Sequence, residues 1–152
     1  MLLVVQTAAG RYIKIFGILP NIAFCFTIVY SLTNGTFRSA ILGLCCGILI
    51  DSTTDMAFGF NSLVIMYIAL SASYFSHKYY YQNKYAVALG VFVYTLVYET
   101  ILIVFSVLLF SEAPFLYSFF RYAFVEAIIN SLISIPVFLW VKWLNNEYIR
   151  GI

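Results

Sequence analysis

The sequence predicts an all-α protein, a polytopic membrane bundle of about six transmembrane helices. Of its 152 residues, 64% are hydrophobic and only 9% are charged, whereas an average soluble domain carries roughly 25% charged residues. A soluble fold of this length would need more charged positions to cover its surface. Long apolar runs follow one another with short polar breaks, so residues 1–152 are expected to form a single integral membrane domain.

Each expected helix is an apolar run that ends at a polar break. The expected spans cover about residues 1–10, 18–32, 37–50, 58–76, 86–110 and 115–143. The first is too short for a complete span, and the second ends at the turn pair Asn34-Gly35. The third is near 20 Å long at about 1.5 Å per residue, short of a hydrocarbon core of roughly 30 Å. It is therefore expected to lie where neighbouring helices thin the bilayer, or to be extended by the polar turn that follows.

The basic residues predict an orientation. With a cytoplasmic amino terminus, five Lys and Arg residues fall on the inner side and two on the outer side; the inner ones are Arg38, Lys78, Lys84, Lys142 and Arg150, and the outer ones are Arg11 and Lys14. Because cytoplasmic connections are enriched in Lys and Arg, both termini are expected in the cytoplasm. The tyrosine-rich stretch of residues 77–85 is typical of an interfacial belt.

Several classes of function are disfavoured. The net charge of +2 is small and the basic residues are dispersed, so no nucleic-acid partner is expected. Cys25, Cys45 and Cys46 lack the spacing of a metal or redox site. The chain has a single histidine, His77, and neither a G-x-S-x-G motif nor a Walker-type loop. We therefore expect no enzyme activity, catalytic residue, metal or cofactor.

The stretch GLCCGILIDSTTDMAFGFNSL, residues 43–63, is the most informative. Gly43 and Gly47 form a G-x-x-x-G pair that lets another helix approach closely, either within the chain or in an oligomer. Asp51 and Asp55 flank a short polar turn, and they are expected to end one helix and to cap the next. A carboxylate pair for acid/base chemistry is the alternative, but no histidine, nucleophile or metal-ligand set accompanies it.

This interpretation predicts the effect of two substitutions. Asp51→Asn keeps one hydrogen-bonding oxygen and should cost about 1 kcal/mol or less, whereas Gly47→Leu inserts bulk into a helix contact and should cost roughly 1–3 kcal/mol.

Two acidic residues are expected deep in the bilayer. Glu99 and Glu126 each lie about 16 Å from the outer end of their span, where charges are costly and mark a pathway, a ligand or a partner. Arg121 is expected to pair with Glu99. A polar stripe at four-residue spacing joins Tyr122, Glu126, Asn130 and Ser134. This stripe serves either as internal helix contact or as a groove for a partner or ligand.

Residues 43–63 resemble the signature of the bacterial rod shape-determining protein MreD family. In that signature a glycine-containing helix ends at an aspartate, and a segment that here holds Gly59 and Asn61 opens the next helix. GILPNIAF, residues 17–24, resembles the family's entry to its second helix, although Asn21 stands where an aspartate is common.

Two further segments agree with the same family. NGTFRSAILG, residues 34–43, resembles its turn into the third helix. NSLISIPVFLWVKWL, residues 130–144, resembles its last helix, with Asn130 and Pro136 followed by a basic end.

The resemblance implies a non-catalytic subunit of the cell-elongation complex in the bacterial cytoplasmic membrane. Such a scaffold subunit supports cell shape and lateral peptidoglycan synthesis together with an MreC-like protein, with RodA and its transpeptidase partner, and with MreB filaments. The family has also been likened in fold to the substrate-binding subunits of energy-coupling-factor transporters. A vitamin-binding subunit is therefore the alternative, and the fold alone does not separate the two functions.

Overall fold

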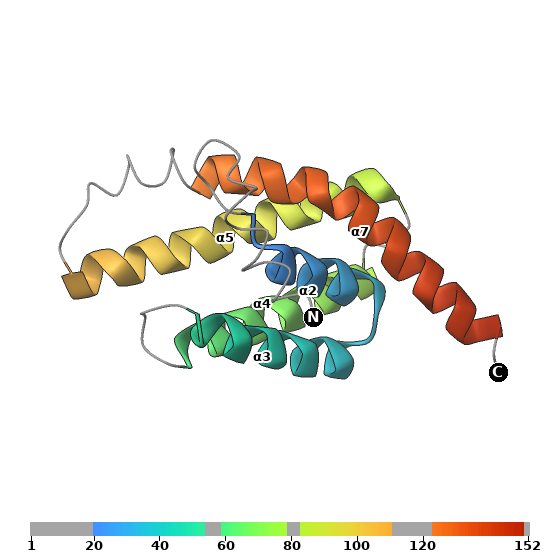
Figure 1. Ribbon diagram of the computed structural model, residues 1–152, viewed down its shortest axis with the longest axis horizontal. Coiled ribbons are helices and arrows are strands. Elements are labelled where there is room, and N and C mark those ends of the chain that lie inside the picture. Colours follow the sequence, from blue (N-terminus) through green and yellow to red (C-terminus); the bar gives the residue numbers. More distant parts are fainter. Residues whose placement is uncertain (1–19, 54–58, 79–82, 111–122, 151–152) are drawn as a thin grey trace.

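The protein is built from helices in every part of the chain that the structure describes. A computed structural model describes residues 20–53, 59–78, 83–110 and 123–150, and these ranges contain no strand (Figure 1). The helices are α2 (Ile22–Thr33), α3 (Thr36–Asp51), α4 (Phe60–Lys78), α5 (Lys84–Phe110) and α7 (Phe124–Arg150). The prediction of an all-α fold is confirmed for these ranges. The described parts of five of the six expected spans fall on these helices. The first expected span, residues 1–10, lies outside the described residues, and so do residues 18–19 of the second span and 115–122 of the sixth.

Two of these helices are long and apolar enough to cross a membrane, over Lys84–Leu108 in α5 and Phe124–Trp143 in α7. Their most apolar windows are only 17% and 33% buried inside the protein. The core helix of a soluble protein would be mostly buried, whereas these helices leave broad apolar faces uncovered. Such faces indicate a lipid environment. α2 and α4 contain shorter apolar stretches, over Ile22–Thr33 and Phe60–Ser76.

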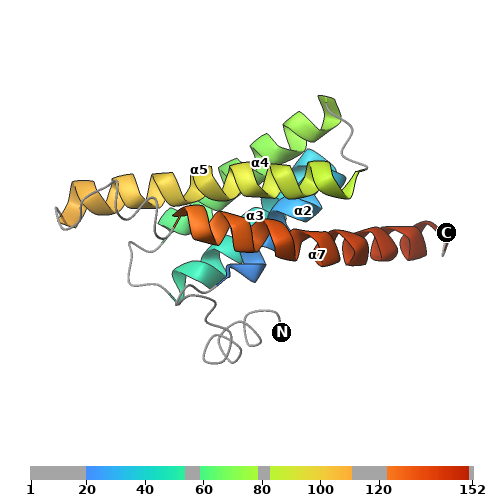
Figure 2. The same cartoon turned by 90° about the horizontal axis from the view of Figure 1, so that it is seen from above.

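Successive helices of the described ranges run in opposite directions (Figure 1), and they form two close pairs. α3 packs along α4, and α5 packs along α7, while α2 contacts all four of these helices. Figure 2 shows the α5 and α7 pair lying over the other helices. The central position of α2 follows from its sequence, since most of its side chains are apolar on every side of the helix.

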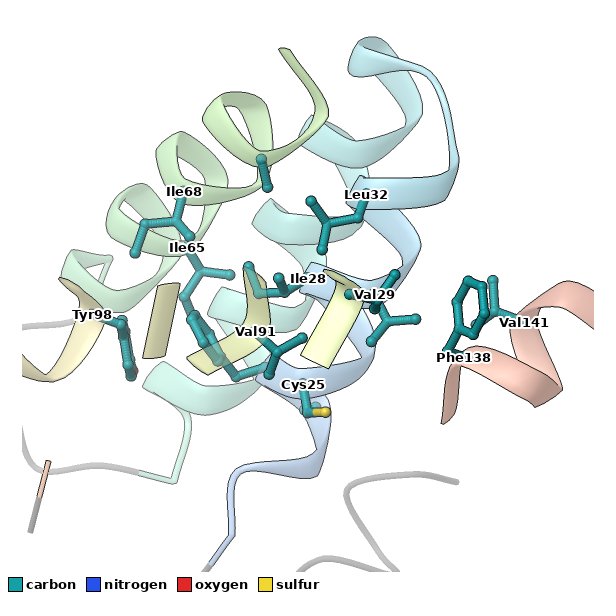
Figure 3. Packing of buried hydrophobic residues seen from close by; sticks show 14 of the residues in the cluster. Cys25, Ile28, Val29, Leu32, Ile65, Ile68, Val91, Tyr98, Phe138 and Val141 are labelled. Atoms are coloured by element: carbon teal, nitrogen blue, oxygen red, sulfur yellow. The ribbon is translucent and has the colours of Figure 1, made fainter. Parts of the chain in front are cut away.

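The core lies where α2 meets the other helices. The residues drawn in Figure 3 include Ile28 and Val29 from α2, Ile65 from α4 and Val91 from α5, all with no exposed surface. Thr27 also lies in α2 with no exposed surface, and its hydroxyl donates to the Ala23 carbonyl at 2.8 Å. Because this bond within the helix satisfies the hydroxyl, a polar side chain is tolerated there.

α7 contains Pro136, and the helix changes direction along its length (Figure 1). Proline removes one backbone donor and crowds the preceding turn, which is the usual cause of such a bend. Beyond the proline, Phe138 and Val141 remain buried, and Trp140 places its ring 6.0 Å from that of Phe26 in α2. The second half of α7 therefore stays attached to α2.

Candidate functional site: a polar junction between the helices

Asp51 is the last residue of α3, and it caps α4 across the intervening turn. Its side chain is 3% exposed. The backbone N–H groups of Gly59, Asn61 and Ser62 donate to its carboxylate at 3.1, 3.1 and 3.0 Å, and the Ser62 hydroxyl donates a further bond. The first N–H groups of a helix have no partner within that helix. The Asp51 carboxylate supplies this partner for the start of α4.

The environment of Asp51 holds the carboxylate in its charged form. Asp51 lies just beyond the expected membrane span of residues 37–50, so its carboxyl is outside that span. Burial alone would raise the pKa of this carboxyl, but the hydrogen bonds from Ser62 and Asn61 outweigh burial and hold the pKa below its usual value. The positive end of the α4 dipole acts in the same direction.

Gly59 gives the turn the backbone conformation that the cap requires. Its φ is +96°, a region that side chains other than glycine rarely adopt. A Cβ at this position would meet no atom within 4 Å. The constraint at Gly59 is therefore conformational, and it directs the N–H toward Asp51.

Gly43 and Gly47 bring the backbones of α3 and α4 together. A Cβ on Gly47 would lie 2.3 Å from the Cα of Ser62, and a Cβ on Gly43 would lie 2.9 Å from the Cβ of Ala69. The partner of this G-x-x-x-G pair is thus α4 of the same chain. The close approach sets Asp51 directly against the first turn of α4.

The junction continues into α5 and α2 through Tyr98. The Tyr98 hydroxyl donates to Asn61 Oδ1 at 2.9 Å, and its ring stacks on Phe24 with the centroids 4.6 Å apart. The carboxyls of Asp51, Glu99 and Glu126 all interact electrostatically with this hydroxyl. Acidic side chains of α3, α5 and α7 therefore all contribute to the electrostatic environment of one buried tyrosine.

Glu126 lies in the first turn of the described α7, where its side chain is half-buried. The ring of Phe124 meets the ring of Phe92 edge to face, with centroids 5.8 Å apart. Phe92 is about 12 Å from the start of α5 and about 27 Å from its end, at 1.5 Å per residue. The start of α7 therefore lies beside the first half of α5. The Glu126 carboxyl interacts there with the side chains of Glu99 and Asn130.

The Asn130 side chain is fully buried beside Glu126. Neither its Nδ2 nor its Oδ1 has a partner within strict hydrogen-bond geometry, so its interaction with the Glu126 carboxyl is not a well-formed hydrogen bond. Its backbone carbonyl accepts from the Cys25 thiol at 3.5 Å. One turn later Ser134 is also buried, but its hydroxyl donates to the Ser131 carbonyl at 2.6 Å.

The junction unites part of the expected site. Gly43, Gly47, Asp51, Gly59 and Asn61 all lie at the contact of α3 with α4, and Glu99, Glu126, Asn130 and Ser134 lie on α5 and α7. Pro136 is exposed and shapes α7 rather than the junction. Asp55, Arg121 and Tyr122 lie outside the described residues, and so does the expected pairing of Arg121 with Glu99.

Two residues of the junction were not predicted from the sequence. Ser62 is the third residue of α4, and its hydroxyl donates to Asp51 instead of accepting from an N–H group of its own helix, so it is not an N-cap that a sequence pattern would reveal. Tyr98 could not be found from local sequence either, because its bond to Asn61 joins residues 37 positions apart. Within the described ranges, no group of three or more His, Cys, Asp or Glu residues is placed to hold a metal ion.

Comparisons with known proteins do not assign the chain to a family. No protein-family model matches it, and neither a curated protein nor a solved structure does.

Proposed function

We propose that this chain is a non-catalytic, multi-pass subunit of the bacterial cell-elongation complex, which supports cell shape and lateral peptidoglycan synthesis with an MreC-like partner. The observation that carries the proposal is the packing of residues 43–53 against residues 59–63, which both belong to the stretch that resembles the MreD signature. Each recorded hydrogen bond to the Asp51 carboxylate comes from the start of α4. A carboxylate used in this way serves the architecture of the bundle rather than acid/base chemistry.

The proposal places the chain in the cytoplasmic membrane with both termini inside. Arg38 lies near the start of α3, Lys84 at the start of α5, and Lys142 near the end of the apolar span of α7. Because consecutive helices run in opposite directions, these three residues lie toward one end of the bundle, and Asp51 lies toward the other. This distribution fits the enrichment of basic residues on the cytoplasmic side. RodA, its transpeptidase partner and MreB filaments are further proposed partners, on the resemblance alone.

A groove between α4 and α5 supports a role in holding another membrane helix. It has a volume of about 410 Å³ and is lined by Phe60, Leu63, Val64, Tyr67, Ile68, Ser71 and Ile101. Leu63 and Tyr67 are 54% and 65% exposed. An apolar groove with small and aromatic side chains suits a hydrophobic helix. We assign it to the transmembrane helix of the MreC-like partner.

Co-purification tests this proposal. The MreC-like protein of the host should co-purify with the wild-type chain, and depletion of the chain should turn rod-shaped cells into rounded ones. The double variant Leu63→Ala/Ile101→Ala should reduce the recovered partner at least fivefold, because it removes two contacts of the groove at about 1 kcal/mol or more in total.

The matched control is Leu89→Ala/Leu132→Ala, which truncates two exposed leucines of α5 and α7 outside the groove. It should recover the partner at the wild-type level. If depleted cells keep their width and no MreC-like protein co-purifies, the proposed function is wrong. If both double variants lose the partner equally, the groove is not its binding surface.

The alternative function, a vitamin-binding subunit of an energy-coupling-factor transporter, makes the opposite prediction. The groove beside α4 and α5 is lined mainly by apolar side chains, whereas a polar vitamin needs several converging polar groups. We expect native mass spectrometry of the purified protein to detect no tightly retained thiamin, riboflavin or biotin. A retained vitamin at stoichiometric occupancy would replace our proposal with this alternative.

A further inference from the structure

A second cleft lies between the start of α5 and the later half of α7, at the opposite end of the bundle from Asp51. It has a volume of about 430 Å³ and is lined by Asn83, Lys84, Phe138, Leu139 and Lys142. This volume falls within the range of roughly 300–1,000 Å³ that is typical of small-ligand sites. The cleft combines two cations with two apolar side chains.

The cleft lies at the edge of the two apolar spans. The span of α5 begins at Lys84, and that of α7 ends at Trp143, one residue beyond Lys142. Because the two helices are antiparallel (Figure 1), both boundaries lie at the same end. Tyr85 and Trp143 are exposed there, at 66% and 54%, as expected of aromatic side chains at the headgroup level.

The positive charge of the cleft is far from the acidic cluster. Asp51, Glu99 and Glu126 act on Tyr98, which lies about 21 Å along α5 from Lys84 at 1.5 Å per residue. The Lys84 ammonium lies 5.1 Å from the centre of the Tyr85 ring, a contact that leaves its charge in place. Lys142 is exposed.

The start of α5 adds to the attraction for an anion. Asn83 caps this helix, since its Oδ1 accepts from the Tyr85 N–H at 3.1 Å. The positive end of the helix dipole therefore lies beside the lysines. Buried Phe138 and exposed Leu139 border the same cleft, so a ligand with both a phosphate and an apolar chain complements the whole cleft.

We propose that the cleft formed by Asn83, Lys84, Phe138, Leu139 and Lys142 binds the headgroup of an anionic phospholipid. The lipid phosphate lies between the two ammonium groups, and its acyl chains run along Phe138 and Leu139 toward the bilayer. Basic pockets between membrane helices at the headgroup level recognise such lipids. The proposal requires a membrane-spanning chain, but it does not depend on the identity of the protein partner.

Native mass spectrometry with defined lipids tests the proposal. The purified protein is offered an equimolar mixture of phosphatidylglycerol and phosphatidylethanolamine with identical acyl chains. The wild type should retain phosphatidylglycerol preferentially. Lys84→Gln and Lys142→Gln should each weaken this binding about fivefold, and the double variant about 30-fold, which corresponds to about 2 kcal/mol at 1.4 kcal/mol per tenfold change.

Arg38→Gln is the matched control, because it removes one exposed positive charge near the same end of the bundle but outside the cleft. It should change the binding less than twofold. Lys142→Arg should retain the lipid, and each single variant keeps the test available if the double variant does not fold.

Three results would overturn the proposal. The first is equal retention of phosphatidylglycerol by the wild type and the lysine variants. The second is an equal loss in Arg38→Gln, which would indicate general surface charge rather than this cleft. The third is complete displacement of the lipid by millimolar inorganic phosphate, which would identify a site for the free anion.

Discussion

Replacing Gly47 with leucine is expected to separate α3 from α4 and to lower the free energy of unfolding by roughly 1–3 kcal/mol or more. Even the first side-chain atom has no room, since a Cβ at this position would lie 2.3 Å from the Cα and 2.9 Å from the N of Ser62. Both atoms belong to the α4 backbone, so no rotation of a side chain relieves the clash. The helix itself must move, and the Asp51 cap would move with it.

A glycine series tests this expectation with internal controls. Gly47→Ala should be the most destabilising of three glycine-to-alanine substitutions. Gly43→Ala should cost less, because its closest contact would be 2.9 Å, to Ala69 Cβ, and the nearest α4 backbone atoms would be 3.1 Å away instead of 2.3 Å. Gly35→Ala should cost least, since a Cβ there meets nothing within 4 Å and only the preference for glycine over alanine at this N-cap is lost. Chemical unfolding of each variant in the same detergent measures the order.

The expected order of stability of these variants follows from the close contact between α3 and α4 of the same chain. Equal stability of the three alanine variants would contradict it. A Gly47 variant that keeps its stability but changes the oligomeric state would instead place a second copy of the chain on this face.

The sequence predicted the local part of this fold well, because local patterns determine it. The apolar runs placed the starts and ends of α3, α4 and α5 within about two residues of the structure. The spacing of Gly43 and Gly47 predicted a close helix contact, although it did not identify α4 as the neighbour. That choice depends on the connection between the helices and on a register that no periodic pattern records.

The long-range part of the junction could not be predicted in the same way. The bond from Tyr98 to Asn61 joins α5 to α4, and the contact of Phe124 with Phe92 fixes how far α7 runs along α5. Each depends on how two helices slide and rotate against one another. The polar stripe at Asn130 and Ser134 was visible as a four-residue repeat, but the lack of a well-formed hydrogen bond at the Asn130 side chain was not.

The structure also changes the expected cost of Asp51→Asn. The estimate of about 1 kcal/mol or less assumed that one hydrogen-bonding oxygen is sufficient. Both oxygens are used: Oδ1 accepts from the Asn61 N–H, and Oδ2 accepts from Gly59 and from Ser62. An asparagine has one acceptor oxygen, and its NH₂ group would then face a backbone N–H.

We therefore expect Asp51→Asn to lower the free energy of unfolding by roughly 1–3 kcal/mol, because it loses one buried hydrogen bond and the charge that strengthens the others. Asp51→Ala should cost more, roughly 2–5 kcal/mol, since it leaves the N–H groups of Gly59, Asn61 and Ser62 without their acceptor. Ser52→Ala is the matched control. Ser52 adjoins Asp51, but it is exposed and donates only to the Ile48 carbonyl of its own helix, so this variant should cost less than about 0.5 kcal/mol.

The stability of each Asp51 variant must be measured beside complex assembly and cell shape, at equal protein level in the membrane. If Asp51 acts as a cap, function should fall in step with stability, and the order should be Ser52→Ala, then Asp51→Asn, then Asp51→Ala. A loss of function without a loss of stability would have a different meaning. An Asp51→Asn protein that is as stable as the wild type and binds its partner, yet fails to support rod shape, would require the carboxylate for chemistry. Asp51 would then be a functional acid at this end of the bundle, in addition to capping α4.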